Sequence, residues 1–258
     1  MLPYLRLGNR LIPMYGVCMT VGILLSSCLA FVRAKRAGKD ENALIVIVAC
    51  AVGIGLICAR LLYVVVSYGV QQAILKILSG DFSPLTEGGL VFYGSLIGGI
   101  LGGILGARIA RESLSSYLAP IVPCIPLGHA FGRLGCFFGG CCYGMPYDGP
   151  LAVRFPAAGV TEPVFPVQLL EALINLVIFI LLILYTRKSR PRGYSLYLYL
   201  LLYSVSRFTL EFLRGDKIRG LSNGLSTSQW ISIVLFGGAL LLMQLPIKKE
   251  AAHRHSNT

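Results

Sequence analysis

The sequence is short of charged residues. Asp, Glu, Lys and Arg make up 13% of its 258 residues, about half the share found in an ordinary soluble domain. Hydrophobic residues make up 55%. A soluble globule of this size needs a charged shell. The composition therefore excludes a water-soluble protein and predicts one whose apolar side chains face lipid.

Acidic residues are especially scarce. The chain has 11 Asp and Glu against 23 Lys and Arg, which gives a net charge of +12. In a soluble protein this excess indicates nucleic-acid binding, whereas in a membrane protein it reflects basic cytoplasmic loops. The sequence also lacks a phosphate-binding glycine loop, a dinucleotide fingerprint and any nucleic-acid-binding module. We therefore expect no nucleic-acid partner.

Apolar runs long enough to cross a membrane recur along the chain. A spanning helix needs about 20 apolar residues. The first run is too long for a signal peptide and no small-residue cleavage site follows it, so we expect it to be retained. The sequence predicts an all-α integral membrane protein, residues 1–258 forming a single polytopic domain. Its seven transmembrane helices are predicted at residues 11–32, 43–66, 89–107, 114–138, 166–185, 194–213 and 228–245.

The predicted fourth helix is irregular, since it contains Pro120, Pro123 and Pro126 besides several glycines. Such residues are tolerated in a membrane where neighbouring helices or a cavity satisfy the freed backbone groups. This segment is therefore expected to face the interior of the helix bundle.

Basic residues in the loops predict the orientation. Lys and Arg are more frequent in loops 33–42, 108–113 and 186–193 and after residue 245 than in the alternate loops. By the positive-inside rule, the N-terminus lies outside and the C-terminus lies in the cytoplasm.

Five ionisable residues lie within or close to the apolar segments: Arg60, Arg133, Glu171, Arg207 and Glu211. A charge at the membrane centre costs at least ~2.5–3.5 kcal/mol, so such residues indicate a functional site. With the predicted orientation, all five fall in the outer half of the bilayer. They are expected to meet in a polar cavity that opens towards the outer leaflet.

An internal ion-pair network is the alternative explanation, for example between Arg207 and Glu211, which are four residues apart. Three arginines and two carboxylates do not balance, however, and an excess of guanidinium favours an anionic ligand. Arginine is the preferred partner of phosphate. In the outer leaflet, that phosphate belongs to phospholipid head groups.

Residues 128–144 contain six glycines around Arg133. Glycine in a membrane helix permits close approach of another helix or of a ligand. Packing alone is the commoner explanation, but the glycines here flank an arginine whose charge must be satisfied, which favours a cradle for a lipid phosphate.

Several motifs together resemble the prolipoprotein diacylglyceryl transferase family. The resemblance covers most of the chain, and the order and spacing of the motifs make it specific. The motifs are Tyr15-Gly16, Ala59-Arg60-Leu61 with Tyr63, the run from Tyr93 to Gly99, Gly132-Arg133-Leu134-Gly135, Pro166-Val167-Gln168-Leu169 with Glu171, Arg207-Phe208, the run from Glu211 to Arg214, and the run from Leu225 to Gln229.

The resemblance implies a function and a location. Members of this family span the bacterial cell membrane seven times with the N-terminus outside. They move the diacylglyceryl group of phosphatidylglycerol onto the lipobox cysteine of a prolipoprotein, which forms a thioether and releases glycerol phosphate. We therefore expect a lipid-dependent enzyme of the inner, cytoplasmic membrane, monomeric and without a cofactor or metal.

The resemblance also implies site residues. Arg133 and Arg207 would hold the phosphate and stabilise its leaving charge, and Tyr93 and His129 are the other candidate catalytic residues. The candidate substrate-binding residues are Tyr15, Arg60, Gly94, Gly98, Gly132, Gly135, Cys136, Cys141, Gly144, Gln168, Glu171, Glu211 and Arg214.

The chain departs from the family pattern at three positions. Cys136 stands where typical members have Asn, and Cys141 stands where they have Glu. Tyr93 replaces a His often proposed as the general base, and tyrosine, with a pKa of about 10, is a poor base. His129 is the nearest substitute. These departures suggest a divergent branch, and leave open an acceptor other than a lipoprotein.

The clustered thiols of Cys136, Cys141 and Cys142 admit four interpretations. The favoured one is that they pack as small residues around the cavity, in which case serine at Cys136 or Cys141 should keep most of the activity. The alternatives are a zinc site with His129, a disulfide between Cys136 and Cys141 or Cys142, and a nucleophile of the enzyme itself.

A transporter or binding protein for an anionic lipid or solute is the main competing function. The charged residues share one outer depth, and the sequence shows no inverted repeat. Transporters place their sites near the midplane between repeats, so the transferase is favoured.

Overall fold

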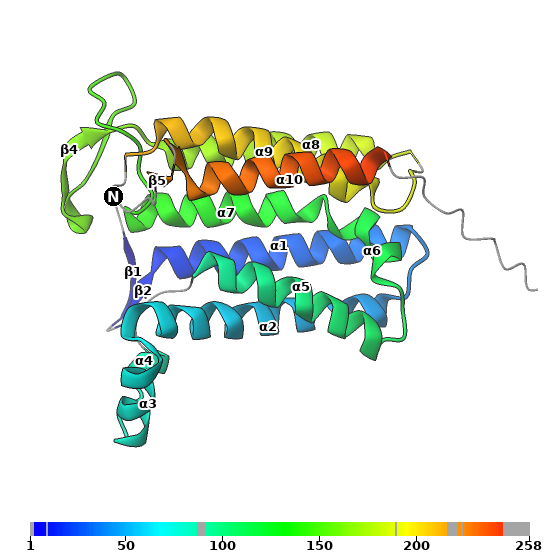
Figure 1. Ribbon diagram of the computed structural model, residues 1–258, viewed down its shortest axis with the longest axis horizontal. Coiled ribbons are helices and arrows are strands. Elements are labelled where there is room, and N and C mark those ends of the chain that lie inside the picture. Colours follow the sequence, from blue (N-terminus) through cyan, green and yellow to red (C-terminus); the bar gives the residue numbers. More distant parts are fainter. Residues whose placement is uncertain are drawn as a thin grey trace, which may run out of the picture. The chain divides into compact units, whose positions relative to one another are not determined.

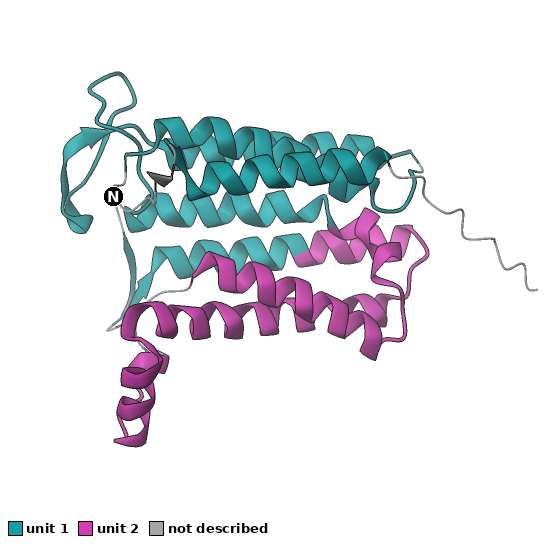
Figure 2. Cartoon of the chain, in the orientation of Figure 1, with its two compact units in different colours: residues 1–26, 122–258 teal, residues 27–121 magenta. Residues whose placement is uncertain are grey.

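The computed structural model describes residues 3–8, 10–86, 91–188, 190–215, 221–222 and 224–244. It divides into two compact units, which are described separately (Figures 1 and 2). Unit 1 comprises Met1–Ser26 and Val122–Thr258, and unit 2 comprises Ser27–Ile121. That the whole chain forms one membrane domain stays a prediction.

The described residues contain six helices long and apolar enough to span a membrane. They are α1 (Met14–Arg36), α2 (Glu41–Tyr68), α5 (Phe92–Ile109), α8 (Val167–Tyr185), α9 (Tyr194–Leu210) and α10 (Thr227–Gln244). The pair α6 (Leu114–Ile121) and α7 (Cys124–Gly139) makes a seventh span if counted as one. The prediction of a helical, multi-pass membrane protein is confirmed, with helix boundaries close to the expected ones.

The predicted fourth helix is broken rather than continuous. It ends at Ile121 and resumes at Cys124, with Pro123 capping the second part. Proline lacks the N–H that would continue the backbone hydrogen bonds. In unit 2, Arg33 donates from Nε to the Pro120 carbonyl (3.1 Å) and from Nη2 to the Ala119 carbonyl (3.0 Å). These bonds satisfy carbonyls that the break exposes.

Unit 2 is built on the contact between α2 and α5. Glycines recur every fourth residue of α5, at Gly94, Gly98, Gly102 and Gly106, and a Cβ atom at any of them would collide with α2. Such small residues let two membrane helices approach closely. A buried cluster that includes Leu44, Ile47 and the fully buried Tyr117 lies in the same unit.

Two short helices complete unit 2, α3 (Val70–Leu78) and α4 (Ser83–Thr86). Asp81 lies between them and contacts Lys76, 3.2 Å from Nζ to Oδ2. Its Oδ1 accepts a hydrogen bond from the Ser83 amide at 2.9 Å. These contacts fix the turn between the two helices.

Unit 1 contains the first half of α1, helices α7 to α10 and three antiparallel hairpins. Two short 3₁₀ turns, η1 (Pro156–Ala158) and η2 (Glu211–Leu213), complete it. In Figure 1 the labelled strands of this unit gather at one end of its helices. The strands pair as β1 (Tyr4–Leu7) with β2 (Arg10–Pro13), β3 (Val153–Phe155) with β4 (Val160–Val164), and β5 (Leu221–Ser222) with β6 (Leu225–Ser226).

Backbone hydrogen bonds tie the loops together at this end. The Gly144 amide donates to the Phe165 carbonyl (2.9 Å), the Met145 amide to the Leu213 carbonyl (2.9 Å) and the Gly215 amide to the Tyr143 carbonyl (3.2 Å). A Cβ on Gly144 would lie 2.5 Å from the Phe165 oxygen and 2.9 Å from the Leu213 oxygen. Only glycine fits at position 144, where the loop after α7 packs against the backbone at Phe165 and at Leu213. The loop is therefore fixed between these two segments.

Candidate active site

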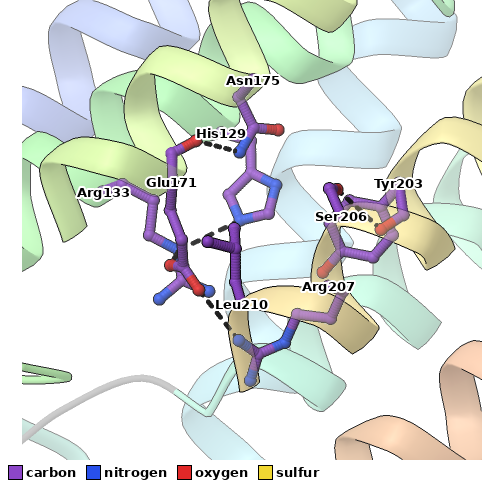
Figure 3. Close-up of a pocket in the computed structure, with 8 residues that line it drawn as sticks. All are labelled: His129, Arg133, Glu171, Asn175, Tyr203, Ser206, Arg207 and Leu210. Carbon is purple, nitrogen blue, oxygen red and sulfur yellow. Dashed lines mark hydrogen bonds and ion pairs between the residues drawn. The ribbon is translucent and has the colours of Figure 1, made fainter. Parts of the chain in front are cut away.

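Two arginines and two glutamates form a buried ion cluster in unit 1. Glu171 Oε2 lies 2.6 Å from Arg133 Nε, and Glu171 Oε1 accepts a hydrogen bond from Arg207 Nη1 at 2.9 Å. Arg207 Nη2 also lies 2.8 Å from Glu211 Oε2. Figure 3 shows the Glu171 carboxylate between the two guanidinium groups. All four side chains are at most 14% exposed.

Separate segments supply these four residues. Arg133 lies in the second half of α7, Glu171 near the start of α8, Arg207 near the end of α9 and Glu211 in η2. Opposite charges bring the three helices together at one level of unit 1. Four of the five charged residues that the sequence predicted to converge do so.

Arg60 lies in unit 2 and has partners there. Its Nε donates to the Leu85 carbonyl (3.0 Å) and its Nη2 to the Pro84 carbonyl (3.2 Å). Its guanidinium also lies 5.2 Å from the centre of the Tyr63 ring. A contact between Arg60 and the substrate stays a prediction.

The charge count within the cluster differs from the sequence expectation. Two guanidinium groups face two carboxylates, so the formal charges balance, and the excess of guanidinium is absent from this cluster. The excess therefore does not argue for an anionic ligand. Binding of an anion here depends instead on the arginine donors that the two carboxylates leave free.

Arg133 retains free donors. Its polar contacts with the described residues use only Nε, which lies near Glu171 Oε2 and also donates to His129 Nε2 at 3.4 Å. Among the residues that the structure describes, none forms a hydrogen bond or ion pair with the two terminal Nη groups of Arg133. These two nitrogens form the paired edge by which arginine binds phosphate.

Unpartnered acceptors lie on the neighbouring helix. Gln168, Glu171 and Asn175 share one buried face of α8, and Gln168 Oε1 and Asn175 Oδ1 have no hydrogen-bond partner in the described part of the chain. Such oxygens can accept hydrogen bonds from hydroxyl groups. Of these three residues, Glu171 and Asn175 line the same cavity as Arg133.

A small cavity lies beside the ion cluster. Its volume is about 10 Å³, room for about one water molecule. A lipid head group does not fit without side-chain movement. The cavity is lined by His129, Arg133, Glu171, Asn175, Tyr203, Ser206, Arg207 and Leu210 (Figure 3).

The two candidate bases lie in different units. His129, in unit 1, lines the cavity, and its ring lies 5.5 Å from the Tyr203 ring. Tyr93, in unit 2, is the second residue of α5 and is 41% exposed. The structure thus brings His129, but not Tyr93, into contact with the ion cluster within one unit. Neither catalytic role is tested by this geometry.

The predicted glycines have packing reasons. A Cβ on Gly94 would strike the α2 backbone at Cys58, and one on Gly98 would lie 2.6 Å from the Ile54 oxygen. A Cβ on Gly135 would lie 3.1 Å from the Tyr15 ring, and one on Gly132 would lie 3.3 Å from Met19 Sδ. On α7, Gly135 thus makes room for Tyr15 and Gly132 for Met19, both residues of α1. Direct contact of these glycines with the substrate stays a prediction.

The end of α7 folds back towards its own last turn. The Cys141 amide donates to the Cys136 carbonyl (3.1 Å), and the Gly140 amide donates to the Phe137 carbonyl (3.3 Å). Gly140 adopts a left-handed φ of 69°. This is a Schellman motif, which places the residue after the glycine beside the last helical turn. It therefore brings Cys141 to Cys136.

The three clustered cysteines converge at this turn. Cys142 has a φ of 59°, a conformation that residues other than glycine rarely adopt. The Sγ atoms of Cys136, Cys141 and Cys142 all lie within 4.8 Å of one another. Hydrogen bonds from the Cys136 and Cys141 thiols, together with the charges of Arg133 and Arg214, hold the pKa of the Cys142 thiol below its ordinary value.

Gln168 links this turn to the ion cluster. Its Nε2 donates to the Cys141 carbonyl at 2.8 Å, and its side chain is fully buried. Gln168 lies one helical turn before Glu171 on α8. Arg214, also predicted in the site, forms a backbone bridge with Gly144 two residues after Cys142.

Sequence reasoning missed five residues of the site. Asn175, Tyr203, Ser206 and Leu210 line the cavity, and Ser228 Oγ accepts a hydrogen bond from Arg207 Nη2 at 3.1 Å. Helical spacing could have identified two of them, since Tyr203 precedes Arg207 and Asn175 follows Glu171 by four residues.

Comparison with known proteins places the chain in a family. The family model described as prolipoprotein diacylglyceryl transferase matches residues 4–245. A Clostridium perfringens protein named phosphatidylglycerol–prolipoprotein diacylglyceryl transferase 2 is 32% identical over 93% of this chain and 94% of its own. Two further relatives have the same name without the number. The Bordetella avium protein is 35% identical over 96% of this chain and 95% of its own. The Clostridium tetani protein is 33% identical over 85% of this chain and 87% of its own.

These matches cover nearly the whole length of both partners, and they agree with the order of motifs and with the membrane-spanning helices. The chain belongs to the prolipoprotein diacylglyceryl transferase family.

Proposed function

We propose that this chain transfers the diacylglyceryl group of phosphatidylglycerol to the lipobox cysteine of a prolipoprotein. The names of its relatives and its multi-pass helical structure support this activity. One observation of the site carries the proposal: Arg133, 14% exposed and sharing Glu171 with Arg207, forms no hydrogen bond or ion pair with a described residue through its terminal nitrogens. A phosphate-binding edge inside a membrane helix fits a phospholipid substrate.

The reaction requires stabilisation of a leaving phosphate. The acceptor sulfur bonds to the glyceryl carbon that carries the phosphate, the C–O bond breaks, and its electron pair leaves with glycerol phosphate. The lipid phosphate has one negative charge, and the departing group develops a second. Donors preorganised at this oxygen therefore bind the transition state more tightly than the substrate.

Arg133 is proposed to hold the phosphate directly, through its free Nη groups. Arg207 is proposed to supply the second positive charge from the opposite side of Glu171. Glu171 and Glu211 fix the two guanidinium groups in place, so little reorganisation is needed when charge develops. The unpartnered oxygens of Gln168 and Asn175 are proposed to accept hydroxyl hydrogens of the glycerol head group.

The proposed orientation places the end of unit 1 that carries its β-hairpins on the outer side of the membrane. Lys and Arg are more frequent in the opposite loops, which supports a cytoplasmic C-terminus. A two-tailed lipid then enters sideways from the outer leaflet of the cytoplasmic membrane, while a secreted acceptor approaches from the outer surface. We propose that the chain acts as a monomer, without a nucleic-acid partner.

The test is a transfer assay with the purified chain. Phosphatidylglycerol vesicles and a lipobox peptide are incubated with the wild type, with Arg133→Ala and with Arg154→Ala, and the peptide mass is measured. Arg154 is an exposed arginine of β3 in the same unit, so it is the matched control. We expect a diacylglyceryl thioether with the wild type and the control, and almost none with Arg133→Ala. Uptake of the lipid or a solute into liposomes without any thioether would refute the transferase.

A further inference from the structure

The three-cysteine cluster is not explained by packing alone. Its sulfur atoms belong to a helix end and to the two residues that follow the turn, and all three approach to within 4.8 Å. Two backbone devices produce this convergence, the Schellman turn at Gly140 and the left-handed conformation of Cys142. A non-glycine residue in that conformation stores strain, which recurs at functional sites.

A disulfide accounts for only part of this arrangement. Any disulfide uses two sulfurs and leaves the third without a reason to converge. Cys141 and Cys142 are also adjacent, and their Cα atoms, about 3.8 Å apart, are closer than disulfide geometry usually allows. A group that binds three sulfurs at once explains all three positions.

The spacing suits a thiolate-bound metal ion. Zinc binds sulfur at about 2.3 Å, so two sulfurs of a tetrahedral site lie about 3.8 Å apart. Three ligands within 4.8 Å of one another need little adjustment to reach this distance. Among the residues described, no histidine or carboxylate joins the group. His129 accepts a hydrogen bond from Arg133 and is not part of it.

A site with three protein ligands leaves the fourth position open. Zinc sites of this kind are typical of catalysis rather than of structure. Cys141 is exposed, whereas Cys136 and Cys142 are half-buried. The open position is thus accessible from the loop side, where a polypeptide can approach. Cys136 follows Arg133 by three residues on α7, so the two share a helix face about one turn apart.

We propose that Cys136, Cys141 and Cys142 bind one zinc ion, whose open position takes up the acceptor thiol as a thiolate. This inference rests on the proposed transferase function. Metal coordination deprotonates a thiol outright, and the thiolate is the nucleophile. The acceptor proton goes to water, the sulfur bonds to the glyceryl carbon, and the C–O electron pair leaves with glycerol phosphate. Neither zinc nor any thiol changes oxidation state.

A metal that lowers the pKa of the acceptor thiol removes the need for a strong base at the site.

Metal binding is tested first, without any lipid. The full chain is purified in detergent under anaerobic, reducing conditions and titrated with Zn²⁺ and Co²⁺, with metal content and the thiolate-to-cobalt absorption as readouts. We expect one metal ion per chain, and loss of the cobalt absorption in Cys136→Ser and Cys142→Ser. Cys28→Ser, which changes an exposed cysteine of α1, should bind as the wild type does.

A conservative variant separates ligation from structural damage. Imidazole is also a zinc ligand, so Cys141→His should keep one cobalt ion with an altered spectrum, whereas Cys141→Ser should lose it. Equal binding by all variants, or no binding by the wild type, would overturn the site. So would a wild-type mass showing a disulfide within the cluster together with no metal uptake after reduction.

The role of the metal is tested with the acceptor. Adding a lipobox cysteine peptide to the cobalt-loaded chain should change its spectrum, and the same peptide with serine in place of cysteine should not. Removing zinc should lower transfer by about 10²-fold or more, and adding zinc should restore it. Transfer unaffected by zinc removal would overturn the role. If the peptide binds the cobalt but no thioether ever forms, the transferase function fails while thiol binding at the metal stands.

Discussion

Glu171 contacts Arg133 through the nitrogen nearest the side-chain stem, with 2.6 Å between Oε2 and Nε. This contact fixes the guanidinium but leaves its outer edge available. Arg207, in contrast, uses both terminal nitrogens, on Glu171, Glu211 and Ser228. The two arginines therefore have different roles: Arg133 can bind a phosphate edge, and Arg207 contributes mainly charge.

Arg133→Lys should fail as a transferase even though it keeps the positive charge. An ammonium group cannot reproduce the two parallel donors of the guanidinium. We expect the rate to fall about 10²-fold, from the loss of roughly 3 kcal/mol of transition-state stabilisation. Initial rates of thioether formation at saturating phosphatidylglycerol measure this. Wild-type rates in Arg133→Lys would show that charge alone matters at this position.

Glu171→Gln should separate binding from turnover. Loss of this carboxylate leaves the ion cluster with a net positive charge, which favours the anionic lipid and should lower KM. The guanidinium groups lose the acceptor that holds them both, so kcat should fall by an order of magnitude or more. Kinetics over a range of lipid concentrations distinguish the two effects. A rise in KM with unchanged kcat would contradict the positioning role.

Gly144→Ala should weaken the loop after α7. The added Cβ would lie 2.5 Å from the Phe165 oxygen and 2.9 Å from the Leu213 oxygen, both backbone atoms that cannot move alone. We expect a lower melting temperature and faster proteolysis between residues 140 and 165. Gly53→Ala is the control, because its Cβ meets nothing within 4 Å, and a helical glycine replaced by alanine gains stability. Equal melting temperatures for the two variants would argue against the close packing of Gly144 against the backbone at Phe165 and Leu213.

The Asp81 turn should resist acid to an unusually low pH. Hydrogen bonds from Ser83 and the contact with Lys76 lower the pKa of this carboxyl to about 2. A depressed folded-state pKa stabilises the turn above the unfolded value, about 3.9, and the stabilisation is lost as pH falls towards 2. The protection of the Ser83 amide against exchange, relative to the unfolded chain at the same pH, should therefore fall in that interval and stay constant above it. Asp81→Asn should show little protection at any pH.

Much of the fold could be predicted because each helix crosses the membrane by itself. Apolar length fixes such a segment whatever its neighbours, so the six long helices lie close to the predicted ranges. The break between Ile121 and Cys124 could be suspected from Pro120 and Pro123, but its position depends on Arg33, which binds carbonyls more than 80 residues away. Sequence spacing does not reveal such a contact.

The part of the site made of charged residues was predictable, because a charged side chain inside an apolar membrane segment costs free energy unless it is paired. Arg133, Glu171, Arg207 and Glu211 lie in apolar segments and have to pair, so their convergence could be expected from sequence. Ser228 and the converging thiols could not, because a serine in a helix start and cysteines in a glycine-rich loop carry no such penalty. Their positions follow from helix capping and turn geometry, which become visible only in three dimensions.

Ser228 offers the last prediction, because helix capping and site contact are separable there. Ser226 Oγ accepts the Gln229 amide (3.3 Å) and Gln229 Oε1 accepts the Ser226 amide (2.9 Å), a capping box that starts α10 without Ser228. The Ser228 hydroxyl instead accepts from Arg207 Nη2 at 3.1 Å. Ser228→Ala should therefore leave α10 and the melting temperature nearly unchanged.

Transfer by Ser228→Ala should fall about 10- to 100-fold, as expected for one hydrogen bond of about 1.5–3 kcal/mol to a charged group. Ser232→Ala is the matched control, because Ser232 donates only to the Ser228 carbonyl of its own helix at 2.8 Å. We expect wild-type transfer in that variant. If both variants lose the same activity, the effect comes from α10 itself and the contact with Arg207 has no part in the reaction.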